Sequence, residues 1–327
     1  GGNGLLLAIL SLDYLHQVLE EQAMNKSRRT QATSGSLAGS ALGRYGYLVP
    51  IFVLFILVEL YPFVYSVVLS FWNKHLLHPN ADQFIGLGNY IKMLQSPHFI
   101  RAIRNSTVFT VGSVVFEYLV GLGSALILNS RHIKFRNLFR AIVLLPWVVP
   151  IAVNSLIWKF MLSPNFGFIN QLLAAIGFPH LLTVNWLGDI RYAMPAVIFV
   201  NVWRSFPFYT ITLLAGLAQI PSDLYEAASI DGASKWQSFI HITLPGIRGV
   251  SQVIVVLHII WTFVNFDVIY LLTKGGPLRM TEVVPTLLYR EAFDFFNMGY
   301  AAAMGVFLLV VLAITVGRAY TKTSSFQ

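Results

Sequence analysis

The sequence predicts an all-α polytopic membrane protein. Of its 327 residues, 56% are hydrophobic and 11% are charged, whereas soluble domains carry about a quarter charged residues. Leu, Val, Ile and Phe occur in long blocks, which is the composition of a chain surrounded by lipid. The chain has no cysteine, which excludes a disulfide framework, cysteine-bound zinc, iron–sulfur clusters and thiol catalysis.

Six apolar runs are long enough to cross a bilayer. A helix that rises about 1.5 Å per residue needs about 20 residues to cross about 30 Å of hydrocarbon. The predicted spans cover residues 46–71, 107–128, 139–160, 193–217, 250–271 and 299–318. Proline removes a backbone donor and bends a helix, so we expect kinks in several spans. The prolines concerned are Pro50, Pro62, Pro146, Pro150, Pro195 and Pro207.

The remaining residues flank this transmembrane domain, which we place at residues 45–318. Residues 1–44 are expected to form a cytoplasmic extension, with a short interfacial helix followed by a flexible tail rich in Ser, Gly and Thr. Met24, followed by Asn-Lys-Ser-Arg-Arg, is typical of a natural chain start. Residues 319–327 are expected to form a cytoplasmic C-terminal tail.

Basic residues predict the orientation. The short segment between the second and third spans holds the densest group, formed by Arg131, Lys134, Arg136 and Arg140. Short cytoplasmic loops carry an excess of Lys and Arg, so this segment is placed inside. We therefore expect a multi-pass protein of the cytoplasmic (inner) membrane with both termini in the cytoplasm.

The segment between the fourth and fifth spans, residues 219–245, breaks the apolar pattern. Pro221 is a helix-start signal, and Gly232 is a residue that ends helices in the left-handed conformation. Ser234 is a good N-cap for a second short helix, expected to run to about Thr243 and to stop at Pro245. The pattern predicts two short cytoplasmic helices that meet at a glycine and form an elbow.

The composition of this elbow favours a docking element over a simple connector. Ala227, Ala228 and Ala233 let a partner surface approach the backbone closely, while Glu226 and Asp231 supply charged anchors. The alternative is a solvated connector between two spans, which has no need for alanines flanked by fixed acids.

These residues also carry a resemblance to a known family. The run Glu226-Ala-Ala-x-x-Asp231-Gly232-Ala233 and the Leu-Pro245 that follows resemble the EAA loop of permease subunits in binding-protein-dependent ABC importers. Residues 84–90 (Phe-Ile-Gly-Leu-Gly-Asn-Tyr) and 266–277, which end in Gly-Gly-Pro, are similar to the carbohydrate-uptake branch, particularly to its maltose-type larger subunit.

The resemblance implies six transmembrane helices of the type I ABC importer permease fold with a cytoplasmic EAA coupling helix. It implies as partners a second homologous permease, a dimer of ATPase subunits, an external solute-binding protein and an oligosaccharide, with no nucleic acid. The chain contains no phosphate-binding loop of the form G-x-x-x-x-G-K-[ST]. We therefore expect no catalytic residue, metal or cofactor in this chain, with ATP and Mg bound by the partner ATPase.

Carried over from the family, two sets of residues have roles. The residues expected to couple to the ATPase are Glu226, Ala227, Ala228, Asp231, Gly232 and Ala233. The residues expected to line the substrate pathway are Asn201, Val202, Arg204, Ser205, Phe208 and His258. Asn and Ser are suited to bind hydroxyl groups, and Phe208 offers a face to a sugar ring.

Arg204 and His258 are the two residues of this set whose side chains can carry a positive charge, so they bear on the charge of the ligand. Arginine binds carboxylate or phosphate through two parallel hydrogen bonds, which favours an acidic ligand such as an alginate-like uronate oligosaccharide. A glycerol phosphate is another ligand that Arg204 could bind in this way. The alternative is that Arg204 is neutralised by a carboxylate and that His258 is a neutral hydrogen-bonding group, which favours a neutral sugar.

A different class of transporter also remains to be weighed. Glu59, Glu117 and Asp267 lie within or beside predicted spans, where an ionisable residue is a functional hypothesis by default. An ion-coupled secondary transporter is therefore the less favoured alternative, because it leaves the EAA elbow without a role.

Overall fold

The computed structural model describes residues 48–78, 80, 82–130, 134–164 and 166–324. The predicted N-terminal extension and part of the basic group, including Arg131, lie outside the described residues. The chain divides into two compact units, residues 1–65 and 66–327, which are considered separately. Apart from one short hairpin, the described part of the chain consists of helices and the loops that connect them.

The described part of the first unit is an apolar helix. Its elements are α3 (Val49–Phe55), η2 (Ile56–Leu60) and the beginning of α4 (Tyr61–Leu69), which continues into the second unit. In η2 the Tyr61 N–H donates to the carbonyl of Ile56, five residues back, directly before Pro62. Pro62 has no backbone N–H to donate to an i−4 carbonyl, and the wider turn before it replaces i→i−4 hydrogen bonds by i→i−5 bonds. No side chain of the run from Val49 to Leu69 is buried within the chain.

The second unit begins with a hairpin and two helices. These are β1 (Trp72–Asn73) paired antiparallel with β2 (Gln83–Phe84), α5 (Gly88–Gln95) and α6 (Pro97–Asn129). The Ser96 hydroxyl caps the start of α6 by accepting from the Phe99 N–H at 3.4 Å. At the other end, the Arg136 guanidinium donates to the carbonyls of Asn129 and Ser130, each at 3.0 Å. A cation at this position satisfies carbonyls that the helix leaves free.

The third predicted span is two helices rather than one. Helix α7 (Arg136–Val148) and helix α8 (Ile151–Met161) meet at an angle of 92°. The break falls at Val149 and Pro150, where the backbone is extended and proline cannot supply the next helical hydrogen bond. Helix α9 (Phe168–Ala175) and η4 (Pro179–Leu181) follow, and the Asn170 amide joins them by donating to the Leu182 carbonyl at 3.0 Å.

The remaining elements complete the bundle. They are α10 (Ala193–Leu217), α11 (Ser222–Ile230), α12 (Lys235–Ser238), η5 (Phe239–Thr243), α13 (Leu244–Gly246), α14 (Arg248–Phe263), α15 (Asp267–Thr273), α16 (Val284–Tyr289), η6 (Arg290–Asp294) and α17 (Met298–Ser324). The fifth predicted span, 250–271, is interrupted between α14 and α15, where Asn265 caps α15 by accepting from the Val268 N–H at 3.2 Å.

Helical turns in the elbow continue past Pro245, where the sequence predicted a stop. The π-helical segment η5 precedes this proline just as η2 precedes Pro62, and the chain bends by 64° only after Gly246. The wide turn of η5 avoids the steric clash that Pro245 would make with the preceding turn of a regular α-helix, so the helix can continue through it.

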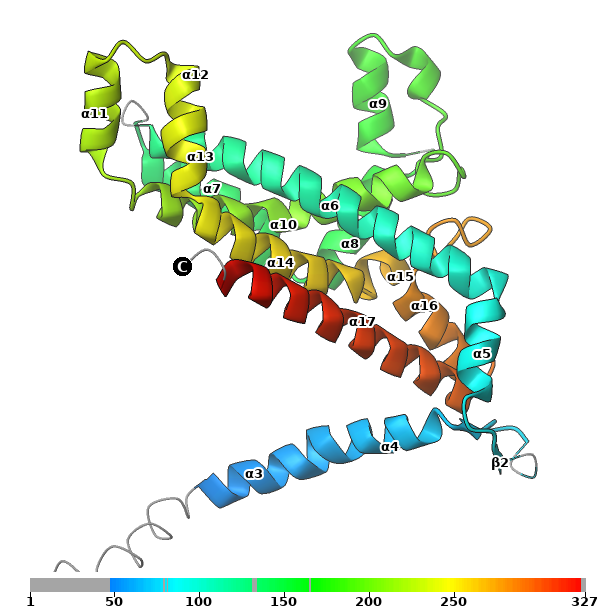
Figure 1. Cartoon of the computed structure of the whole chain (residues 1–327). Coiled ribbons are helices and arrows are strands. Elements are labelled where there is room, and N and C mark those ends of the chain that lie inside the picture. Colours follow the sequence, from blue (N-terminus) through cyan, green and yellow to red (C-terminus); the bar gives the residue numbers. More distant parts are fainter. Residues whose placement is uncertain (1–47, 79, 81, 131–133, 165, 325–327) are drawn as a thin grey trace, which may run out of the picture. The chain divides into compact units, whose positions relative to one another are not determined.

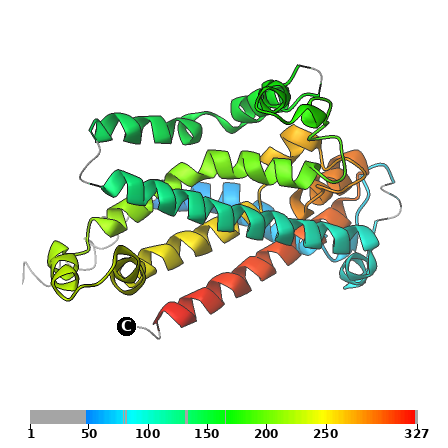
Figure 2. The same cartoon turned by 90° about the horizontal axis from the view of Figure 1, so that it is seen from above.

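Among the described residues, four helices are long and apolar enough to cross a membrane, and six if each bent pair forms one span. Within the second unit, α6, α10 and α14 lie between the α7–α8 pair and α17 (Figure 2). Three buried apolar clusters hold this unit together; one of them joins α6, α10 and α14 through Ala125, Tyr209, Leu213 and Ile254.

Candidate functional site

The predicted elbow is a helical hairpin at one end of the bundle. Figure 1 shows α11 and α12 side by side beyond the ends of α10 and α14, while α9 lies at the opposite end of α10. Gly232 has φ +77°, so it adopts the left-handed conformation that the turn requires. The Ser234 hydroxyl accepts from the Gln237 N–H at 3.3 Å, and the Gln237 side chain accepts from the Ser234 N–H at 2.7 Å. This capping box starts the second arm where the sequence predicts it.

All six predicted coupling residues lie on this hairpin. Glu226, Ala227, Asp231 and Gly232 are exposed, and Ala228 and Ala233 are half-buried. We use the name elbow surface for these six residues together with Leu224, Ile230 and Trp236, whose exposed fractions are 50%, 86% and 67%. These three apolar residues were not predicted from the sequence, although their spacing on two short helices places them beside the predicted coupling residues.

The hairpin is fastened to the bundle beneath it. The hydroxyls of Tyr225 on α11 and Thr243 in η5 are 2.9 Å apart, which links the two arms. Ile220, Phe239 and Leu244 pack against the buried cluster shared by α6, α10 and α14. The hairpin therefore packs on a cluster to which all three helices contribute.

The predicted pathway residues lie on two neighbouring helices. Five of them are on α10 and His258 is on α14. Asn201, Val202, Ser205 and His258 are buried within the chain, whereas Arg204 and Phe208 are half-buried. The structure thus brings the set together but leaves only two of its side chains partly open.

A buried carboxylate that was not assigned to this set organises it. Glu117 of α6 has no exposed surface. Its Oε1 accepts from the Asn201 amide at 2.9 Å, and its Oε2 lies 2.9 Å from Nδ1 of His258. Ser205, on the same helix as Asn201, also lies close to this carboxylate. We call Glu117, Asn201, Ser205 and His258 the polar cluster; the sequence marked Glu117 as an ionisable residue in a span without identifying its partners.

Close packing of α6 on α10 makes this contact possible. Gly121 lies one turn beyond Glu117 on α6, and a Cβ atom there would lie 2.3 Å from Cβ of Tyr209. Small residues let helices in membranes approach closely. Gly121 therefore brings the α6 backbone near enough to α10 for the Glu117 side chain to reach Asn201.

Aromatic rings surround the imidazole of His258. The ring centroids of Tyr209, Phe208 and Trp261 lie 4.4, 5.4 and 5.4 Å from it. The Nε2 atom of His258 and the Oδ1 atom of Asn201 are buried and have no hydrogen-bond partner among the described residues. The cluster therefore keeps two polar atoms unused.

Arg204 lies on α10, like Asn201 and Ser205, but is not bonded to the polar cluster. No described carboxylate forms an ion pair with it, and its Nε atom has no hydrogen-bond partner within the part of the chain that the structure describes. Glu117 and the exposed Asp267 act on it only through longer-range electrostatics. Arg204 is thus a half-buried cation without a local counter-charge at bonding distance.

Opposite the elbow, a second carboxylate fixes the loop before α16. Glu282 is 2% exposed and lies 2.7 Å from the Arg290 guanidinium and 3.7 Å from that of Arg279. Burial raises the pKa of this carboxyl above its ordinary value, although the two guanidinium groups oppose the shift. The Asn105 amide donates to the Arg279 and Glu282 carbonyls at 3.1 and 3.0 Å, which ties the loop to α6.

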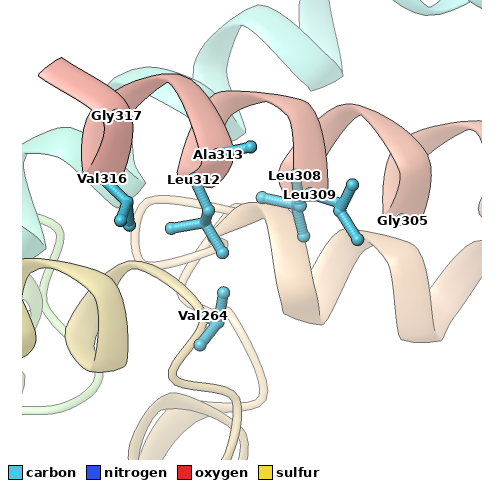
Figure 3. Close-up of a pocket in the computed structure, with 8 residues that line it drawn as sticks. All are labelled: Val264, Gly305, Leu308, Leu309, Leu312, Ala313, Val316 and Gly317. Atoms are coloured by element: carbon cyan, nitrogen blue, oxygen red, sulfur yellow. The ribbon is translucent and has the colours of Figure 1, made fainter. Parts of the chain in front are cut away.

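Two other features do not form a polar ligand site. A groove along α17, shown in Figure 3, is lined by glycine and apolar residues such as Leu308, Leu312 and Val264, so it offers no side-chain hydrogen-bonding group. In the described ranges, His, Asp and Glu residues form no group of three that could hold a metal ion.

The comparison with protein families decides the class of this chain. Residues 117–322 match the family described as the binding-protein-dependent transport system inner membrane component. The chain belongs to that family. Its members are the membrane permeases of ABC importers, in which a separate ATPase subunit hydrolyses ATP. The predicted fold class and family are confirmed, and an ion-coupled secondary transporter is not the class to which this family belongs.

Individual relatives of this permease agree with the family. It is 38% identical to the probable ABC transporter permease YurN of Bacillus subtilis, over 83% of this chain and 92% of that protein. It is 38% identical to the trehalose/maltose permease MalF of Thermococcus litoralis, over 79% of this chain and 86% of that protein. Among solved structures, this chain is similar to one chain of a bacterial ABC transporter involved in the import of the acidic polysaccharide alginate. The two chains superpose with a TM-score of 0.75 at 28% sequence identity, and the match covers 88% of this chain and 98% of that chain.

Proposed function

We propose that this permease conducts an acidic oligosaccharide through an ABC importer. The observation that carries the proposal is Arg204, a half-buried guanidinium on α10 with no ion pair among the described residues. Such a group binds a carboxylate through charge-assisted hydrogen bonds. The fold similarity to an importer of alginate, an acidic polysaccharide, supports the same ligand class, including uronate oligosaccharides.

The assembly that we propose contains a second homologous permease, two ATPase subunits and an external solute-binding protein. The elbow surface supports the ATPase contact, because it exposes apolar side chains beside Glu226 and Asp231 and is fastened to three helices. The elbow end of the bundle also carries Arg136 and Lys235. We therefore propose that the elbow end of the bundle faces the cytoplasm and the opposite end faces the binding protein. That both termini are cytoplasmic stays a proposal from the distribution of basic residues in the sequence.

The second candidate ligand is a neutral sugar. It is favoured by the bond between His258 and Glu117, because a carboxylate beside the imidazole leaves the pair neutral or negative. The trehalose/maltose permease among the relatives supports this candidate too. Glycerol phosphate, the remaining alternative, is an anion that Arg204 alone would have to recognise.

The test uses the complete transporter in proteoliposomes. The cognate binding protein is first screened against neutral and acidic oligosaccharides, and uptake of the bound ligand is then measured for the wild type, Arg204→Ala and Arg204→Lys. We expect Arg204→Ala to lower uptake of a uronate oligosaccharide about 100-fold, since charge-assisted bonds are lost. ATPase assembly should persist.

Lys159→Ala is the matched control, because Lys159 is an exposed basic residue in the last turn of α8. It should transport like the wild type. Undiminished uptake by Arg204→Ala, or a binding protein that takes only neutral sugars, contradicts the acidic ligand.

A further inference from the structure

The polar cluster joins three helices through one side chain. The two oxygens of Glu117, on α6, each take one partner: Asn201 from α10 and His258 from α14, both at 2.9 Å. Glu117 itself has no exposed surface and is not among the residues expected to line the pathway. It therefore holds two pathway residues in place without facing the pathway itself.

We infer that Glu117 is a positioning residue for transport, which holds His258 with a protonated Nδ1 toward the carboxylate and leaves Nε2 to hydrogen-bond the ligand. This inference rests on the proposed function, because it concerns the same pathway. An ionised carboxylate only accepts hydrogen bonds, so it selects a proton on the nearer ring nitrogen. Which nitrogen of a histidine is used is set by the bond that the other makes.

The surroundings of the ring support this role. Tyr209, Phe208 and Trp261 pack around the imidazole and leave it little room to turn. Nε2 is buried and has no hydrogen-bond partner in the described residues. Because buried polar atoms are usually hydrogen-bonded, we expect Nε2 to bind a group from outside these residues. The half-buried Phe208 beside it offers an apolar ring face, which suits a carbohydrate that presents a hydroxyl next to its C–H face.

The same bond divides the work of recognition between two residues. With Glu117 ionised, the pair of Glu117 and His258 is neutral or negative whether or not the imidazole is protonated, so His258 adds no net positive charge to the pathway. Arg204 is then the group that recognises a carboxylate, and His258 recognises a hydroxyl. The expected ligand is therefore an oligosaccharide that offers a carboxylate to Arg204 and a neighbouring hydroxyl to His258.

The first test observes the imidazole directly. Nitrogen NMR of the complete transporter with ¹⁵N-labelled histidine reports which ring nitrogen carries a proton, and His258→Gln identifies the signal. We expect a protonated Nδ1 in the wild type and in Glu117→Gln, whose amide oxygen can still accept, and its loss in Glu117→Leu. An unprotonated Nδ1 in the wild type overturns the inference without relying on any variant that must fold.

The second test measures transport per ATP hydrolysed. Glu117→Leu and His258→Gln should each lower it about tenfold, the size of one lost hydrogen bond to a charged group. The double variant should be no worse than the poorer single variant, because the two residues act as a unit. Glu117→Gln should stay within about threefold of the wild type, since it keeps an acceptor for Nδ1.

Glu59→Leu is the matched control, since Glu59 is the acid of η2 and is exposed. It should behave as the wild type does. Normal transport by an assembled Glu117→Leu transporter, or additive losses in the double variant, overturns the inference. A wild-type transporter that moves no carbohydrate overturns the proposed function instead, so the two failures are distinguishable.

Discussion

The elbow and the polar cluster place acidic side chains in opposite surroundings. Glu226 and Asp231 of the elbow are exposed, and the bonds that shape its turn join residues three positions apart. Glu117 is wholly buried, and its partners Asn201 and His258 are 84 and 141 residues away in the sequence. The elbow is thus built by local bonds and leaves its charges exposed, whereas the cluster joins distant parts of the chain and pairs its charge with buried side chains.

The largest effect expected of a change in the elbow tests whether the elbow acts through contact with another subunit. Glu226→Lys reverses an exposed charge without removing a contact in the chain that the structure describes, so the permease should fold normally. Transport per ATP hydrolysed by the reconstituted importer should nevertheless fall more than about tenfold. In the proposed contact, the reversed charge at position 226 would repel the ATPase group that Glu226 attracts.

The control for Glu226→Lys is Asp189→Lys at the opposite end of α10. The Arg191 side chain and backbone N–H hold the pKa of Asp189 at about 2 through hydrogen bonds, but this surface pair is expected to contribute little to stability. Asp189→Lys should keep transport coupled to ATP hydrolysis. Full coupling in Glu226→Lys removes the elbow from the ATPase contact.

The next effect tests whether the polar cluster depends on the close approach of two helices. Gly121→Val places atoms where the Tyr209 side chain lies and should destabilise the permease by about 3 kcal/mol, as overpacking does. The thermal unfolding midpoint in detergent measures this loss. Gly123→Ala on the same helix meets no atom within 4 Å and should leave the midpoint unchanged or raise it slightly.

A smaller effect concerns the turn of the elbow. Gly232→Ala puts a Cβ on a residue with φ +77°, at a cost of about 1 to 2 kcal/mol. No atom lies within 4 Å of that Cβ, so the cost is one of backbone conformation alone. Hydrogen exchange of α11 and α12 should quicken while α10 stays protected. Gly249→Ala, which lies in α14 and also meets no neighbour, is the control.

The smallest effect comes from the capping box. Ser234→Ala removes the hydroxyl that accepts from the Gln237 N–H and should cost about 1 kcal/mol. Faster exchange restricted to α12 would show that the elbow is held by local bonds. Ser234→Asp keeps an acceptor and should restore protection, and equal exchange in all three proteins would contradict the role of this cap.

How far the sequence could predict the molecule follows the same division. Pro221, Gly232 and Ser234 act on their immediate neighbours, so the two arms of the elbow and their turn could be predicted from short patterns. The spans followed from hydrophobic length. The partners of Glu117 could not be predicted, because hydrophobic periodicity does not show which faces of α6, α10 and α14 meet.

The bends show an intermediate case. Pro150 was expected to kink one span, whereas the chain forms two helices at 92°, and this angle depends on the packing of α8 against α15, which is distant in sequence. At Pro245 the local rule was misleading, because the wide turn of η5 lets the helix pass the proline. The coupling and pathway roles themselves stay predictions until the complete transporter is tested.

Helix α6 has a mechanical consequence that follows from its length. Its 33 residues form a rod of about 50 Å, longer than the roughly 30 Å of a hydrocarbon core. Near its start, Asn105 hydrogen-bonds to the loop that precedes α16, and in the middle Glu117 bonds to α10 and α14. Near its end, Leu128 belongs to the apolar cluster on which the elbow packs. We therefore expect α6 to carry a displacement of the elbow to the loop before α16 along one continuous helix.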